Sequence, residues 1–203
     1  MLLSKEPTTL ERRLLRTLKS YSAEMASDDE PTNKIPANMQ GLLTLVQQMR
    51  QSVAAGLYLY MPAIMVALTL PDVMGALGSE DGKASGSKYR TWLSDHAGYP
   101  ADDAVLIWGI RCSLLHHGRA NKGDIEVAFT VPGTGQLHKL SIEAHDGVRV
   151  AWYSIEGFVE DIAAAVIAWL ERFALTARAQ RNLERFARLR PEGVSAVHGP
   201  VLA

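Results

Sequence analysis

The spacing of apolar residues predicts a chain built mainly from helices. Residues 9–25 and residues 38–60 both carry apolar side chains three and four positions apart, the period of an amphipathic helix. The first of these also carries a row of basic residues, typical of a solvated face, with a partner-binding or RNA-facing arm as the alternative. Polar residues and prolines at 26–36 predict a loop, and Gly and Ser at 78–87 predict another, followed by a short helix over 88–96.

The most apolar part of the chain follows Arg50. No residue between Arg50 and Asp72 carries a formal charge, a length that approaches the roughly 20 residues of a membrane span. Prolines at positions 62 and 71 interrupt this run, and no basic cluster stands at either end to orient an inserted helix. We therefore expect no membrane span but a pair of buried helices, broken near Gly56 or kinked at Pro62.

After residue 119 the apolar period changes from helical to two. Apolar and polar residues alternate over 125–131, and the turn sequences at 132–135 and 146–147 separate this run from apolar residues around 140–142 and 148–152. The pattern predicts a three-stranded antiparallel meander within residues 124–153, inserted before the last long helix. It would serve as scaffold or as the edge of a dimer.

A long final helix is predicted to begin after Ser154, a residue type that caps helices. Its apolar face runs to Phe173, and its end is basic, with arginines at 178, 181, 185, 188 and 190. Cations near a helix C-terminus are favourable, so solvation explains the arginines, and contact with an RNA backbone is the alternative. Residues 191–203 are expected to be a flexible tail.

The helix over residues 104–117 contains the residues of greatest chemical interest. Its positions 104–115 are apolar or small except for Arg111 and Ser113, so most of this helix should be buried. A buried guanidinium needs a carboxylate partner or an anionic ligand. Asp72 is a candidate partner for Arg111, although it could instead be a first-turn carboxylate after Pro71. Gly118 is expected to end the helix.

Arg111 and His116 stand five residues apart in this helix. Such residues are separated by about 140° around the axis and about 7.5 Å along it, so they do not share one face. We therefore predict a homodimer in which two copies of the helix cross and place the arginine of one protomer beside the histidine of the other.

The motif Arg111-Cys-Ser-Leu-Leu-His116, followed by His117 and Gly118, resembles the signature of the HEPN superfamily. That family comprises all-helical, usually dimeric domains, many of them metal-independent RNases of toxin–antitoxin and anti-phage systems. The resemblance extends in outline over residues 39–175 and implies a HEPN-like helical bundle. Active members commonly carry a polar residue directly after the arginine, where this chain has Cys112.

The resemblance implies that Arg111 and His116 line a cleft at the dimer interface and cut RNA. We name Asp72, Cys112 and His117 as supporting residues of this site. RNA carries its own nucleophile, the 2′-OH, so a protein need only move protons and stabilise charge on phosphorus. In that scheme His116 transfers protons and Arg111 binds the scissile phosphate. We expect no cofactor, and no metal, because adjacent histidines on a helix point about 100° apart and chelate poorly.

The partners implied by the resemblance are RNA, a second copy of the chain and a cognate antitoxin. The basic residues Arg119, Arg181 and Arg185 are the candidates for contact with RNA.

Two other functions remain open from the residues. In the first, the chain is a non-catalytic helical dimer, a binding or structural module, with Arg111 in a structural ion pair. In the second, Cys112 is a thiol nucleophile with His116 four positions away on the same helix face. A cysteine on an apolar helix is more often a small core residue.

Length, charge and cysteine content narrow the class of protein. The 203 residues, 47% of them hydrophobic, suit one globular domain over residues 1–203. A formal charge of −1 excludes a generally basic nucleic-acid coat, so any RNA site would be a local patch. A single cysteine excludes an intrachain disulfide, and no long apolar core follows the first residues, so we expect a cytoplasmic protein.

Overall fold

The structure is a computed structural model. It describes residues 35–56, 59–119, 121–131, 141–145 and 147–185, with short segments between 189 and 202. By its internal contacts the chain divides into two units, Met1–Lys34 and Ile35–Ala203, and every described element belongs to the second. The predicted helix at 9–25, most of the predicted loop at 26–36, the turn at 132–135 and Arg188 lie outside the described residues.

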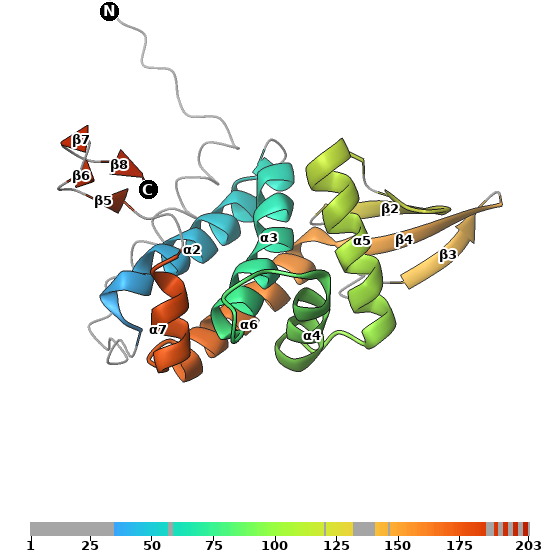
Figure 1. Ribbon diagram of the computed structural model, residues 1–203. Helices are drawn as coiled ribbons and strands as arrows, with labels where there is room; N and C mark the ends of the chain where they lie inside the picture. The colour runs from blue at the N-terminus through green and yellow to red at the C-terminus, as the bar shows by residue number, and fades with distance from the viewer. Residues whose placement is uncertain are drawn as a thin grey trace, which may run out of the picture. The chain divides into compact units, whose positions relative to one another are not determined.

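The described part of the chain is mainly helical, as predicted (Figure 1). Its helices are η1 (Ala37–Met39), α2 (Gln40–Ala55), α3 (Tyr60–Gly78), α4 (Gly86–His96), α5 (Ala101–His117), α6 (Ile155–Phe173) and α7 (Ala177–Leu183). The main sheet contains β1 (Asn121–Lys122), β2 (Ile125–Thr130), β3 (Ser141–His145) and β4 (Val148–Ser154). Four two-residue strands follow, β5 (Leu189–Arg190) just before the predicted tail, and β6 (Gly193–Val194), β7 (Val197–His198) and β8 (Val201–Leu202) within it.

Helix α3 lies at the centre of the helical part and contacts α2, α4, α5, α6 and α7. The predicted break before it is confirmed: α2 ends at Ala55, and Gly56 adopts φ 101°, a conformation that favours glycine. Pro62 lies in the first turn of α3, while Pro71 lies inside the helix. By length and composition α3 could cross a membrane, yet 56% of its apolar window is buried inside the fold, as in the core helix of a soluble protein.

The strand order of the sheet differs from the predicted meander. The order is β1-β2-β4-β3, with β2 parallel to β4 and β3 antiparallel to β4. The hairpin turn at Gly147, which adopts φ 80°, is confirmed, but β2 does not pair with β3. The prediction was wrong because an alternating pattern locates strands without fixing which strands are neighbours. Strand β3 therefore lies on the side of β4 away from β2.

The prediction of one long final helix is also wrong, because two helices, α6 and α7, occupy this part of the chain. Ser154 caps α6 as expected, its Oγ accepting a hydrogen bond from Gly157 N at 3.1 Å. Helix α6 ends at Phe173, and α7 begins after Thr176, whose Oγ1 accepts from Ala179 N at 3.3 Å. This second cap lets the chain turn so that α7 packs against α3.

Candidate functional site

Local signals at both ends of α5 position the Arg-x4-His motif. Asp102 and Asp103 lie in its first turn, where carboxylates interact favourably with the helix dipole. Gly118 adopts φ 65° and its N–H donates to Leu114 O at 3.0 Å, which ends the helix as predicted. The last turn of α5 therefore carries both histidines of the motif.

Arg111 forms an ion pair with Asp72 of α3. Arg111 Nε and Nη2 lie 2.8 and 2.7 Å from Asp72 Oδ2. The side chains are 20% and 9% exposed. Burial raises the pKa of the Asp72 carboxyl above its usual value, and the neighbouring Arg111 opposes this shift. Of the two explanations for Asp72, the partner of Arg111 is the one observed, and the first-turn explanation is wrong because α3 continues through Pro71.

The indole ring of Trp108 also contacts the same guanidinium. Arg111 Cζ lies 5.2 Å from the centre of the Trp108 ring, within the range of a cation–π interaction. Trp108 is held in turn by Tyr89, with ring centres 5.0 Å apart. Sequence reasoning missed Trp108, although its position one helical turn before Arg111 was a usable signal. Together Asp72 and Trp108 fix the orientation of the guanidinium.

Arg111 and His116 meet within one chain. Arg111 Nη1 lies 3.4 Å from His116 Nε2, at an exposed position. The expectation that the two side chains would need two protomers is therefore corrected. The helical offset describes where the Cβ atoms point, whereas the long arginine side chain extends along the helix far enough to reach the next turn.

The two edges of the Arg111 guanidinium therefore have different neighbours. Nε and Nη2 face the carboxylate of Asp72, and Nη1 faces outward beside the imidazole of His116. An oriented guanidinium edge next to an imidazole can bind a phosphate oxygen and exchange a proton with a neighbouring hydroxyl.

The remaining residues of the motif are spread over more than one face. Cys112 is partly buried and Ser113 Oγ donates to Asn121 Oδ1 of β1 at 2.7 Å. The ring of His117 is exposed and its centre lies 6.4 Å from that of His116. Arg119 is exposed just after the helix. Within the described residues no hydrogen bond joins Cys112 to His116, so the geometry of a thiol–imidazole dyad is not formed.

Basic residues of α7, and Arg185 just after it, contact the loop between α3 and α4. Arg181 Nη2 donates to Glu80 O at 3.4 Å, and Arg185 Nη1 donates to Asp81 O at 2.6 Å. Arg178 forms an ion pair with the carboxylate of Glu80. The structure does not bring Arg181 and Arg185 together with Arg111, because α7 packs on α3 beside this loop.

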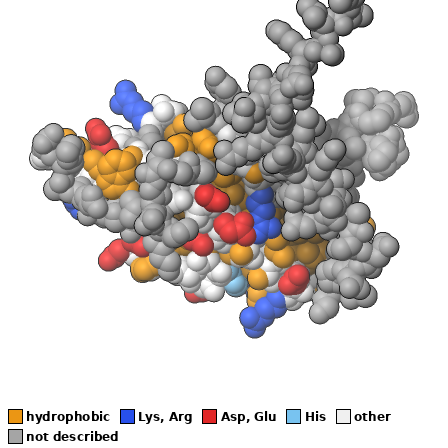
Figure 2. Space-filling view, turned by 180° about the vertical axis from the view of Figure 1, so that it is seen from behind, with side chains coloured by type: hydrophobic (Ala, Val, Ile, Leu, Met, Phe, Trp, Pro, Cys, Tyr) orange, Lys and Arg blue, Asp and Glu red, His pale blue; other side chains and the backbone are white. Residues whose placement is uncertain are grey.

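Acidic, basic and apolar side chains are interspersed among the coloured residues of the face shown in Figure 2. On this face basic side chains stand apart from one another, next to acidic and apolar side chains. Over the described ranges no group of three or more His, Cys, Asp or Glu side chains could hold a metal ion.

Comparison of the chain with protein-family models, with curated protein sequences and with solved structures finds no match.

Proposed function

We propose that this protein is a metal-independent endoribonuclease of the HEPN type, with Arg111 and His116 as its catalytic residues. The observation that carries the proposal is the 3.4 Å approach of Arg111 Nη1 to His116 Nε2 at the exposed end of α5. The pairing of Arg111 with Asp72 supports it, because a guanidinium held on one side presents its free edge in a constant direction.

The reaction uses the nucleophile that RNA already carries. His116 accepts the proton of the 2′-OH, whose oxygen attacks the adjacent phosphorus while the bond to the 5′ oxygen breaks. Arg111 binds a non-bridging phosphate oxygen and stabilises the charge that develops there. The protonated His116 returns this proton, directly or through solvent, to the 5′ oxygen, and the products are a 2′,3′-cyclic phosphate and a 5′-hydroxyl.

We extend the proposal to the cellular role of the protein. A HEPN-type nuclease would act in the cytoplasm as a homodimer, as a toxin or phage-defence component with a cognate antitoxin. Arg119 lies closest in sequence to the motif and is the first candidate for a backbone contact with RNA, followed by Arg181 and Arg185. Since the arginine and histidine meet in one chain, dimer formation would serve to shape the RNA-binding cleft and not to complete the pair.

The contacts of Arg111 with Asp72 and Trp108 also support a second candidate function. Asp72 occupies two of the three guanidinium nitrogens of Arg111, and Trp108 covers its face. These contacts suit an arginine whose role is to join α3 to α5. In that case the protein is a non-catalytic helical module, and His116 is a surface residue near a structural ion pair.

Matched histidine substitutions distinguish the two functions. For a nuclease, His116→Ala should lower the rate of RNA cleavage by about a hundredfold or more. His117→Ala, the neighbouring exposed histidine, should leave most activity. Arg111→Lys retains a cation beside Asp72 but loses the planar fork, and it should lower the rate by a similar factor. Cys112→Ser should have little effect, which separates this chemistry from a thiol nucleophile.

The assay measures cleavage of a structured and an unstructured RNA, with sequencing of the ends and circular dichroism of each variant. A 2′,3′-cyclic phosphate that disappears in His116→Ala and persists with EDTA supports the nuclease. If purified wild-type protein cleaves neither RNA, or if folded His116→Ala cleaves as fast as wild type, the catalytic function of this pair is refuted.

A further inference from the structure

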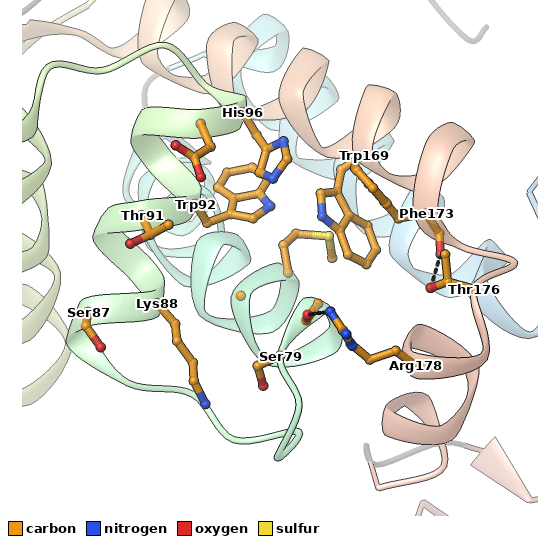
Figure 3. Close-up of a pocket in the computed structure, with 14 residues that line it drawn as sticks. Ser79, Ser87, Lys88, Thr91, Trp92, His96, Trp169, Phe173, Thr176 and Arg178 are labelled. Carbon is orange, nitrogen blue, oxygen red and sulfur yellow. Dashed lines mark hydrogen bonds between the residues drawn. The ribbon is translucent and has the colours of Figure 1, made fainter.

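A pocket of about 610 Å³ lies away from the Arg-x4-His motif, between α3, α4, α6 and α7 (Figure 3). Its apolar lining includes Met74 from α3, Trp92 from α4, and Trp169 and Phe173 from α6. None of the motif residues lines it. The volume falls within the range of about 300–1,000 Å³ that is typical of small-molecule sites.

Trp92, which lines this pocket, has a polar atom that no described residue satisfies. Its side chain is 3% exposed, and its Nε1 is buried without a hydrogen-bond partner among the described residues. Figure 3 shows the indoles of Trp92 and Trp169 on opposite sides of the pocket, with their nitrogens on the facing edges. Buried N–H donors are nearly always paired in folded proteins, so an acceptor that reaches this atom from the pocket, after a small movement of the side chains that cover it, would satisfy it.

The charged side chains that line the pocket indicate the net charge of its ligand. Lys88 and Arg178 line the pocket, but each forms an ion pair, with Asp81 and Glu80 respectively. Asp95 also lines the pocket. A rim whose cations are already paired offers little net attraction to an anion. The ligand is therefore expected to be neutral.

We infer that this pocket binds a flat, neutral aromatic molecule bearing a carbonyl oxygen, which accepts a hydrogen bond from Trp92 Nε1. The aromatic lining supplies stacking and edge contacts to a planar ring system. Met74 also lines the pocket, and its flexible thioether side chain can adjust to admit the oxygen. This site is separate from the proposed nuclease, and its ligand binding does not require RNA cleavage.

A matched pair of probes tests the inference. 2-Acetylnaphthalene and 2-ethylnaphthalene share the same naphthalene ring system, and only the first carries a carbonyl oxygen. The chain has four tryptophans, whose indole N–H groups give separate signals in nitrogen–proton NMR spectra. Titration with the acetyl compound should shift the Trp92 signal downfield and also move Trp169, while Trp108 and Trp152 stay in place. The ethyl compound should bind about threefold to tenfold more weakly, the usual contribution of one hydrogen bond.

Trp92→Phe assigns the signal and supplies the control variant. It keeps an aromatic ring in the lining but removes the donor, so the two probes should bind it with equal affinity. Equal binding of both probes by wild type would overturn the role of Trp92 Nε1, even if the variant failed to fold. Movement of all four indole signals, or of none at the solubility limit of the acetyl compound, would overturn the site. We expect Trp92→Phe to cleave RNA at the full rate. The ligand-binding pocket and the nuclease can therefore be refuted independently of each other.

Discussion

The ion pair between Arg111 and Asp72 can be tested without reference to any activity. Arg111→Ala removes the cation and leaves the Asp72 carboxylate, only 9% exposed, without a charged partner. Breaking a buried pair in this way typically costs about 3–5 kcal/mol, and because Arg111 is itself 20% exposed we expect about 2–4 kcal/mol at neutral pH. The free energy of unfolding should fall by this amount.

The pH dependence of this loss identifies its cause. Burial already raises the folded-state pKa of Asp72 above the value of 3.8, and removal of Arg111 raises it further. A carboxyl with a raised folded-state pKa binds its proton more tightly in the folded protein, so its contribution is favourable in acid and is lost as the pH rises through that pKa. The destabilisation caused by Arg111→Ala should therefore be larger at about pH 7.5 than at about pH 4.5.

Urea unfolding followed by circular dichroism at both pH values measures this difference. Adding Asp72→Asn to Arg111→Ala removes the buried charge, so the double variant should be more stable at neutral pH than Arg111→Ala alone. The reasoning would be refuted if Arg111→Ala changed the unfolding free energy by less than about 0.5 kcal/mol, the size of an ordinary surface substitution. It would also be refuted if the loss were the same at both pH values.

Two further substitutions test the packing around the two sites. A Cβ at Gly86 would lie 2.8 Å from Trp108 Cε2, so Gly86→Ala should destabilise by about 1–3 kcal/mol in thermal or urea unfolding. Gly41→Ala, where the Cβ would meet nothing within 4 Å, should not destabilise. Asn182→Ala removes the donor to carbonyls at the end of α3 and just after it and should cost about 1–3 kcal/mol in the same assay, with exposed Arg185→Ala costing less.

Features that depend on neighbouring residues were predictable from the sequence. Gly118 ends α5 and Ser154 caps α6 because a glycine conformation and a hydroxyl acceptor act within one helical turn. The pairing of Arg111 with Asp72 was also predictable in outline, since a guanidinium in an apolar helix requires an acidic partner and Asp72 stands at the end of a long uncharged run.

Features that depend on distant parts of the chain were not predictable. The order of the strands is set by tertiary packing, so alternation at 125–130 and 148–154 could not reveal that β2 and β4 are parallel neighbours. The break between α6 and α7 carries neither glycine nor proline. Thr176, the cap, was its only local signal.

The pocket was missed although part of its signal is visible in the sequence. Trp92 and His96 are four positions apart on one helix, as are Trp169 and Phe173 on another, so each pair lies on one helix face. Sequence alone cannot show that the two faces meet. In the structure His96 contacts Phe173, with ring centres 5.9 Å apart, which joins the two helices beside the pocket.

Because α7 comes late in the chain, the two sites can form at different times during synthesis. Arg178 meets Glu80 across 98 positions of chain, and Thr176 and Arg178 complete one side of the pocket. Asp72 and Arg111 precede those residues by about 65 positions or more, so they are made first and leave the ribosome earlier. A nascent chain can therefore join α3 to α5 while the pocket still lacks a wall, so the pocket is the last of the two sites to close and the first to be lost when the chain is cut before α7.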